Sequence, residues 1–309
     1  MEQRSRRRFA EPDGVVAPSP VARSAGDGPA AAAADWPLFA LAFTVGACIG
    51  SFLNVCIHRL PADESIVRPG SHCPRCSTPI AWYDNLPLVS WAWLGARCRA
   101  CRARIPARYP LVEGATGALA LLALARFGAT PAAAVAFAFS AALLLITFID
   151  LDHRFIPDEV SLPGVVVGLA SAFLPGRVAP LDALLGVLVG GGLLWSVAWG
   201  YERWTGVEGM GYGDVKLLAM IGAFLGWQAV PAVLVVASLT GSLAGMTLIA
   251  VRGGGRGGRR VVRRLGPRAF LPFARRVARR TAIPFGPFLA LGAMLALYLP
   301  DLTMPWRVG

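Results

Sequence analysis

The stretch EGMGYGDVKLLAM, residues 208–220, places an aspartate and the chain's only lysine, Lys216, directly before an apolar run. Asp214 therefore stands at the edge of a segment that the sequence predicts to lie in a membrane. A carboxylate is costly at such a position, and acidic groups within membrane segments usually serve a function. Gly211 and Gly213 favour a tight turn and the close approach of a substrate strand. The alternative is that Asp214 only begins a helix, where the helix dipole stabilises a negative charge.

The composition predicts an all-α polytopic membrane protein. Of the 309 residues, 55% are hydrophobic and only 16% are charged, and the mean hydropathy is +0.56. Roughly a quarter of the residues of a soluble domain are charged, which argues against that class. The net charge of +12 would suit a nucleic-acid-binding protein. However, the arginines cluster in a few connections between apolar runs, as they do in membrane proteins. We therefore expect the lipid membrane as a partner and no nucleic acid.

Eight segments are candidates for membrane-spanning helices, each of which needs roughly 20 apolar residues. They are 37–57, 109–128, 130–149, 160–176, 181–200, 214–227, 229–251 and 283–299. The connection 58–108 holds eight arginines, and the connection 252–282 holds eleven arginines and no acid. Because positively charged connections stay on the cytoplasmic side, we expect both of these to be cytoplasmic and the N-terminal tail to lie outside.

The same patterns divide the chain into parts. These are a disordered tail (1–35), the first transmembrane helix (36–57), a cytoplasmic four-cysteine loop domain (58–108), a membrane-embedded aspartic peptidase domain (109–299) with an Arg-rich cytoplasmic insert (252–282), and a C-terminal tail (300–309). The N-terminal tail (1–35) is rich in Ala, Pro and Arg and lacks apolar periodicity, and such a composition is typical of disordered segments. The insert is expected to lie against the anionic inner leaflet, where each arginine near the surface gains about 1 kcal/mol.

A second group of carboxylates lies in ITFIDLDHRFIPDEV, residues 146–160. Two predicted crossings separate Asp150 from Asp214, so both fall on the cytoplasmic face. Two carboxyl groups in one site of low dielectric share a proton. Such a pair can activate water and protonate a leaving amine, which is the chemistry of aspartic proteases. Asp152 and Asp158 are rival acids on residue pattern alone.

Four cysteines in the first cytoplasmic loop form two C-x2-C pairs, Cys73 with Cys76 and Cys98 with Cys101. Two such pairs can close a tetrahedral metal site. The 21 residues between the pairs slightly exceed the usual spacing of about 15–20. Because cytoplasmic thiols stay reduced, a disulfide is disfavoured. We predict structural zinc here, with an iron centre or a redox pair as the alternatives.

Seven stretches together resemble the bifunctional prepilin peptidases, the type IV leader peptidase family of GxGD-type membrane aspartic proteases with N-methyltransferase activity. They are GSFLNVCIHRLP (50–61), the paired C-x2-C loop, NLPLVSW (85–91), RYPLVEGATG (108–117), IDLDHRFIPD (149–158), EGMGYGDVKLLAMIGAFLGW (208–227) and IPFGPFLALG (283–292). The stretches follow the order of the family from about residue 40 to residue 299.

The resemblance implies an enzyme of the bacterial inner membrane with its active site facing the cytoplasm. Such an enzyme cuts the leader peptide from type IV prepilins and type II secretion pseudopilins. It then methylates the new N-terminal amine, usually of phenylalanine, with S-adenosylmethionine. The catalytic aspartates of the family match Asp150 and Asp214. The residues that we expect to support this site are Gly211, Gly213, Lys216 and Asp152.

Two other functions remain open. The first is a peptidase without methyl transfer, like shorter relatives that lack the cysteine loop, and the intact cysteines argue against it. The second is a non-enzymatic, zinc-stabilised membrane assembly factor, which the two aspartates on one face disfavour. The chain also departs from the family pattern: members often have two glycines before the second cysteine pair, whereas this chain has Gly95 and Ala96. Because this loop is linked to methyl transfer in the family, the alanine concerns that second activity.

The charge pattern makes a prediction about topology. Reporter fusions at Ser77 and Gly266, within the two arginine-rich connections, should both report a cytoplasmic location. A fusion at Ala129, in the short neutral connection between segments 109–128 and 130–149, serves as the control and should report the opposite side. Opposite locations for Ser77 and Gly266 would contradict the predicted number of crossings.

Overall fold

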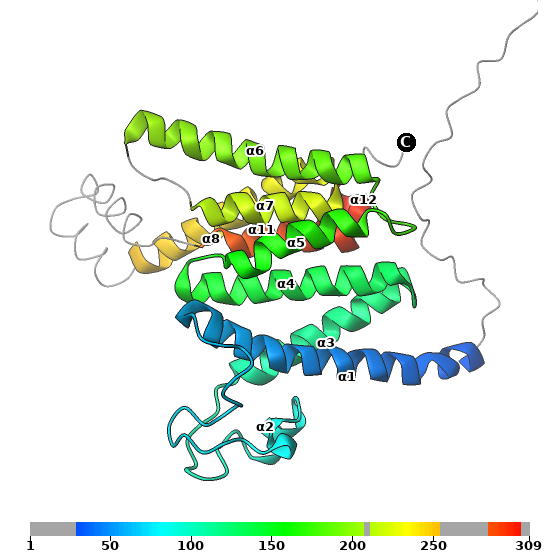
Figure 1. Cartoon of the computed structure of the whole chain (residues 1–309), viewed down its shortest axis with the longest axis vertical. Coiled ribbons are helices and arrows are strands. Elements are labelled where there is room, and N and C mark those ends of the chain that lie inside the picture. Colours follow the sequence, from blue (N-terminus) through cyan, green and yellow to red (C-terminus); the bar gives the residue numbers. More distant parts are fainter. Residues whose placement is uncertain (1–28, 207–210, 254–283, 304–309) are drawn as a thin grey trace, which may run out of the picture.

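The computed structural model describes residues 29–206, 211–253 and 284–303, and in these ranges the chain forms helices and no β-strand (Figure 1). The longer helices are α1 (Pro29–Arg59), α3 (Arg108–Phe127), α4 (Pro131–His153), α5 (Asp158–Ser171), α6 (Pro180–Thr205), α7 (Tyr212–Leu225), α8 (Ala229–Gly253) and α11 (Gly286–Tyr298). Short helices are η1 (Leu60–Ala62), η2 (Trp82–Asn85), α2 (Val89–Trp93) and α12 (Pro300–Thr303). The all-α fold class is confirmed, and each of the eight apolar segments coincides with a helix.

Five of the described helices are long and apolar enough to cross a membrane. They are Trp36–Ala62, Arg108–Phe127, Pro131–His153, Pro180–Thr205 and Ala229–Leu248. The helices α5, α7 and α11 have 14, 14 and 13 residues. At 1.5 Å per residue, a helix of 14 residues covers about 21 Å, which is less than a hydrocarbon core of about 30 Å. The count of eight crossings therefore stays a prediction.

Several predicted parts lie wholly or partly outside the described residues. Residues 1–28 of the tail, 254–282 of the Arg-rich insert and 304–309 of the C-terminal tail are among them. Within the described part, α1 begins at Pro29, whereas the sequence led us to expect a helix from residue 36.

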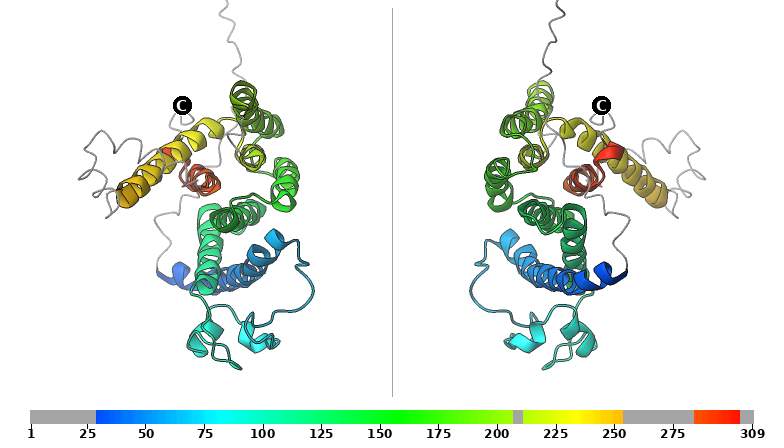
Figure 2. Two further views of the ribbon diagram at one scale, coloured as in Figure 1. Left: turned by 90° about the vertical axis from the view of Figure 1, so that its left-hand side faces the viewer. Right: turned by 90° about the vertical axis from the view of Figure 1, so that its right-hand side faces the viewer.

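The helix α7 lies at the centre of the peptidase half of the fold. It packs against α5, α6, α8 and α11. Its side chains Leu217, Leu218, Met220 and Ile221 are fully buried and form much of the hydrophobic core. Figure 2 views this bundle along its helices and shows α11 in its middle, where it contacts α4, α7 and α8. The first turn of α7 is thus held on several sides.

Glycines allow the closest helix contacts. A Cβ atom added at Gly186 of α6 would overlap the backbone of Gly222 of α7, and one at Gly190 would lie 2.6 Å from the Leu218 carbonyl oxygen. On the other side of the molecule, a Cβ at Gly50 of α1 would lie 2.7 Å from Cα of Glu113 in α3. Membrane helices associate through such small residues, because lipid supplies no hydrophobic driving force between them.

The bundle brings several helix ends to one side. The C-terminal ends of α1, α4 and α6 and the first residues of α5 and α7 lie at the same end, on the left in Figure 1. The four-cysteine loop, which includes α2, extends from α1 and α3 outside the bundle. Any side chains in the last turn of α4 and the first turn of α7 therefore belong to one end of the protein.

The glycine contact predicts a position-dependent effect on stability. Gly186→Leu should lower the midpoint of thermal unfolding in detergent, because overpacking typically costs about 1–3 kcal/mol. Gly192→Leu is the matched control on the same helix, since a Cβ at this position meets no neighbouring atom. Equal midpoints for the two variants would contradict the tight packing of α6 on α7.

Candidate active site and four-cysteine centre

Asp150 lies in the last turn of α4 (Pro131–His153) and is only 5% exposed. Its Oδ2 atom accepts a hydrogen bond of 3.0 Å from the backbone N–H of Gly286, the first residue of α11. A Cβ at position 286 would lie 2.6 Å from the same oxygen, so a glycine is needed there. The positive end of the α11 dipole also faces this carboxylate. The structure thus buries Asp150 and provides it with a specific donor.

Asp214 lies in the first turn of α7 (Tyr212–Leu225), at the same end of the bundle as the last turn of α4, which carries Asp150 (Figure 1). The structure thus brings both aspartates to one end of the protein. Gly213 supports this arrangement, because a Cβ there would lie 2.9 Å from Cβ of Ile156, a residue just after Asp150 in the chain. Gly211 comes directly before α7, and its carbonyl accepts a hydrogen bond of 3.1 Å from the Asp214 N–H. Its φ of −68° and ψ of 132° are open to any residue, and a Cβ there would meet no neighbour. Residues 207–210 lie outside the described residues, so the expected tight turn stays a prediction.

Asp152 forms an ion pair with Arg108, the first residue of α3. The Arg108 guanidinium also lies over the Phe148 ring, 5.1 Å from its centroid. Two residues along a helix correspond to a rotation of about 200°, so Asp150 and Asp152 occupy nearly opposite faces of α4. Asp152 therefore joins α4 to the N-terminal half of the protein.

Lys216 forms an ion pair with Asp158, the first residue of α5. Its Nζ atom donates to both carboxylate oxygens at 2.7 and 2.6 Å. The pair connects the first turns of α5 and α7, which flank the segment after Asp150. Asp158, a rival acid by sequence pattern, is thus neutralised by the chain's only lysine. The pair holds the start of α7 in place.

Sequence reasoning missed the roles of Gly286 and Arg108. Both lie in stretches that carry the family resemblance, IPFGPFLALG and RYPLVEGATG. Their partners are 136 and 44 residues away in the chain, so no local spacing predicts the contacts. The family resemblance draws attention to Gly286 and Arg108 but does not indicate which residues they contact.

The four cysteines of the loop come together in space. All four Sγ atoms lie within 4.8 Å of one another. The Sγ atoms of Cys73 and Cys101 lie 3.8 Å apart, and those of Cys76 and Cys98 lie 4.0 Å apart. A tetrahedral zinc ion with Zn–S bonds of about 2.3 Å requires sulfur–sulfur distances of roughly 3.8 Å. The donor set and its geometry fit a closed site of four thiolates.

The two cysteine pairs have the same backbone structure. In the first turn, the Ser77 N–H donates to the Cys73 carbonyl at 2.8 Å, and in the second the Arg102 N–H donates to the Cys98 carbonyl at 3.0 Å. Ser77 and Arg102 also share a left-handed conformation, with φ of 55° and 58°. Each turn presents two thiols toward the other turn, which is how paired C-x2-C motifs form metal sites.

The thiols have unequal acidity. Hydrogen bonding with Thr78 lowers the pKa of the Cys76 thiol to about 6, and backbone hydrogen bonds from Cys101 and Ala100 lower the pKa of Cys98. A hydrogen bond with Ala103 favours the Cys101 thiolate, but desolvation and the neighbouring thiols raise its pKa to about 11. Four crowded thiolates repel one another, and a divalent cation would relieve this repulsion.

Comparison with known proteins gives two family matches along the chain. Residues 44–127 match the family described as the bacterial peptidase A24 N-terminal domain, and residues 137–246 match the type IV leader peptidase family. The first match contains all four clustered cysteines, and the second contains both Asp150 and Asp214. No solved structure matches the chain.

Individual relatives extend over most of the chain. A protein of Aeromonas salmonicida (strain A449) named prepilin leader peptidase/N-methyltransferase is 38% identical, covering 89% of this chain and 95% of the relative. A relative of the same name in Myxococcus xanthus is 46% identical, covering 70% of this chain and 65% of the relative. Another in Pseudomonas aeruginosa is 38% identical, covering 83% of this chain and 89% of the relative.

The cysteine geometry makes a prediction about metal content. Purified protein should contain about one zinc per chain, and the Cys73→Ser, Cys98→Ser double variant should lose it, since a tetrahedral site needs all four ligands. The control is Cys48→Ser, Cys56→Ser, which changes two cysteines outside the cluster. Elemental analysis measures the metal directly. Unchanged zinc in the first double variant would exclude this cluster as the site.

Proposed function

Since the chain belongs to the type IV leader peptidase family, we propose that it cleaves the leader peptide of type IV prepilins or type II secretion pseudopilins. We further propose that it N-methylates the new N-terminal residue, usually phenylalanine, with S-adenosylmethionine. Relatives named prepilin leader peptidase/N-methyltransferase support both activities at 36–46% identity. The observation that carries the proposal is the position of Asp150 and Asp214 at the same end of the helix bundle.

The two aspartates act as one acid–base pair in the proposed cleavage. The ionised carboxylate takes a proton from water, and the resulting hydroxide adds to the scissile carbonyl carbon. The protonated carboxyl donates a hydrogen bond to the carbonyl oxygen. When the tetrahedral intermediate collapses, the C–N bond breaks and the leaving amine takes a proton from the pair. No covalent link between enzyme and substrate forms.

The surroundings of Asp150 support its role as the charged member of the pair. The Gly286 N–H donates to its Oδ2 atom, and the start of α11 faces it. A carboxylate that accepts a backbone hydrogen bond at a helix N-terminus is stabilised in its ionised form. Asp214 then holds the proton in the resting enzyme. The pair titrates as a unit, so a pH profile of cleavage reports both groups together.

The remaining parts have supporting roles in this proposal. Gly213 lets α7 approach Ile156, and Lys216 and Asp152 secure the helix ends through their ion pairs. Zinc in the four-cysteine site is structural, because all four ligand positions are filled by protein. S-adenosylmethionine supplies a methyl group on a sulfonium centre when bound. We place the active site on the cytoplasmic face, beside the arginine-rich loop 58–108.

A peptidase without methyl transfer is the second candidate, and Ala96 is the observation that bears on it. Gly95 and Ala96 both have left-handed backbone conformations, with φ of 58° and 57°. This conformation costs a non-glycine residue about 1–2 kcal/mol. Nevertheless the Ala96 N–H donates to the Trp91 carbonyl at 2.8 Å, and its carbonyl accepts from the Ile105 N–H at 2.7 Å. The loop thus accommodates alanine in this conformation, and the bifunctional enzyme is the activity that we propose.

The aspartate pair predicts the outcome of three substitutions. Asp150→Asn and Asp214→Asn should each reduce cleavage of a synthetic prepilin peptide about a thousandfold or more, and the double variant should be scarcely worse, because the pair acts as a unit. Asp152→Asn is the control, since its partner is Arg108, and it should retain activity. Mass spectrometry follows cleavage and methylation on the same preparations.

Methylation distinguishes loss of chemistry from loss of folding in this experiment. A pilin peptide that is already cleaved should still be methylated by the Asp150→Asn and Asp214→Asn proteins, because methyl transfer needs no hydrolytic water. Substantial cleavage by the Asp214→Asn protein would remove the aspartate pair from the mechanism.

A further inference from the structure

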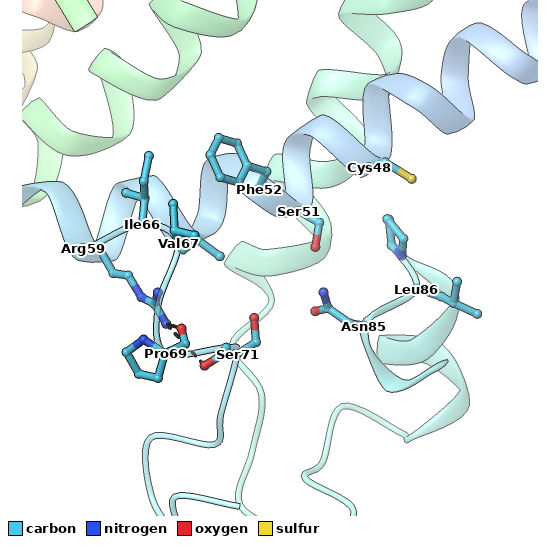
Figure 3. A pocket seen from close by; sticks show the side chains of 13 residues that line it. Cys48, Ser51, Phe52, Arg59, Ile66, Val67, Pro69, Ser71, Asn85 and Leu86 are labelled. Carbon is cyan, nitrogen blue, oxygen red and sulfur yellow. Dashed lines mark hydrogen bonds between the residues drawn. The ribbon is translucent and has the colours of Figure 1, made fainter. Parts of the chain in front are cut away.

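A cavity of ≈ 390 Å³ lies between α1 and the four-cysteine loop (Figure 3). Its walls come from residues 48–59 of α1 and from loop residues 66–71 and 85–87. Known small-molecule sites have volumes of about 300–1,000 Å³, so the size suits a cofactor-like ligand. The cavity lies within the N-terminal match at 44–127, whereas both aspartates lie within the peptidase match at 137–246.

The lining combines apolar and polar groups. Ser51 and Phe52 project from α1, and Asn85 and Leu86 come from the facing loop. Figure 3 shows the Ser51 hydroxyl of α1 and the Asn85 amide of the loop facing each other, with the Phe52 ring on the side of Ile66 and Val67. An aromatic ring suits a flat heterocycle, and a hydroxyl and an amide suit its polar edges. Such a lining is typical of sites for ligands that carry both a base and polar substituents.

One end of the cavity is positively charged. The Arg59 guanidinium donates to the Ser65 carbonyl at 2.9 Å and to the Pro69 carbonyl at 2.8 Å, which fixes its position at the wall. Within the described ranges, no carboxylate lies at ion-pair distance from Arg59. Its charge is therefore available to a ligand carboxylate, for which arginine is the preferred partner.

A negative group lies behind the opposite part of the wall. Glu113 of α3 is 7% exposed and accepts the Leu88 N–H at 2.7 Å. In the part of the chain that the structure describes, no arginine, lysine or histidine forms an ion pair with it. Glu113 therefore holds the end of the facing loop in position. It also makes this wall favourable for a positive charge.

We propose that this cavity binds S-adenosylmethionine, an inference that rests on the methyltransferase activity of the proposed function. The Arg59 guanidinium is suited to bind the ligand carboxylate. The wall of Ser51 and Asn85, in front of Glu113, is suited to the positive sulfonium centre. The Phe52 ring is suited to stack on the adenine. Methyl transfer then belongs to the N-terminal domain, and peptide cleavage belongs to the aspartates. The two activities have separate sites that one substrate visits in turn.

Ligand binding without peptide substrate tests the assignment directly. Radiolabelled S-adenosylmethionine is titrated onto the full-length protein in detergent by equilibrium dialysis. Ser51→Trp, which fills the cavity, should raise Kd at least tenfold, and Arg59→Gln and Glu113→Gln should each raise it several-fold. Val45→Trp is the matched control, because Val45 is an exposed residue of α1 outside the cavity lining. It should leave Kd unchanged.

Cleavage of a prepilin peptide by the same preparations reports on folding. Loss of methyl transfer by the Ser51→Trp protein supports the proposal where this protein still cleaves the peptide, because retained cleavage shows that it is folded. If this bulky change impairs folding, Ser51→Ala and Glu113→Gln replace it, and a raised Kd with cleavage retained supports the proposal. Photo-crosslinked label should map to peptides that contain residues 48–71 or 85–87.

Three results have distinct meanings. Normal donor binding by the Ser51→Trp, Arg59→Gln and Glu113→Gln proteins, or label within 137–246, overturns the cavity assignment and leaves the proposed function intact. Loss of a co-purified phospholipid from Ser51→Trp with unchanged donor binding identifies a lipid site, which also overturns it. If the unmodified protein cleaves prepilin but neither binds S-adenosylmethionine nor methylates the product, the proposed methyltransferase activity is itself wrong, and this inference fails with it.

Discussion

The hydrogen bond from the Gly286 amide to the Asp150 carboxylate is the contact on which the proposed active site depends. It joins the end of α4 to the start of α11 across 136 residues of sequence. A carboxylate that is 5% exposed needs such a donor, because burial of an unsatisfied charged group costs several kcal/mol. Since a Cβ at position 286 would crowd the same oxygen, the contact also requires glycine. The second aspartate reaches this end of the protein through the position of α7, whose first turn the Lys216–Asp158 ion pair joins to α5.

Small residues determine where the ends of the helices lie. Gly186 and Gly222 let α6 and α7 touch through their backbones, and Gly50 does the same for α1 and α3. In a membrane such contacts are made by packing and hydrogen bonding, because lipid offers no hydrophobic gain. Rigid helix pairs can hold a first-turn residue such as Asp214 within a fraction of an ångström, as acid–base catalysis needs.

The two halves of the molecule meet through an ion pair and an aromatic contact. Arg108 at the start of α3 pairs with Asp152 near the end of α4 and lies over the Phe148 ring. The four-cysteine loop ends just before Arg108, so this contact places the end of the loop at the end of the helix that carries Asp150. An enzyme that cleaves and then methylates one chain end benefits from such proximity, because the cleaved amine has a short path to the donor.

Patterns along the chain were sufficient to predict the helices and the clustering of the four cysteines. They also mark the two aspartates, whose catalytic role stays a prediction. Apolar runs and C-x2-C spacing are local signals, and they coincide with helices and with a thiol cluster in the structure. The tight turn expected at Gly211 stays a prediction, because residues 207–210 lie outside the described residues, whereas the close packing at Gly213 is seen directly. The support of Asp150 by Gly286, the Arg108–Asp152 pair and the cavity in front of Glu113 were decided by tertiary structure. These contacts join residues far apart in the chain, and only the packing of helices brings them within hydrogen-bond distance.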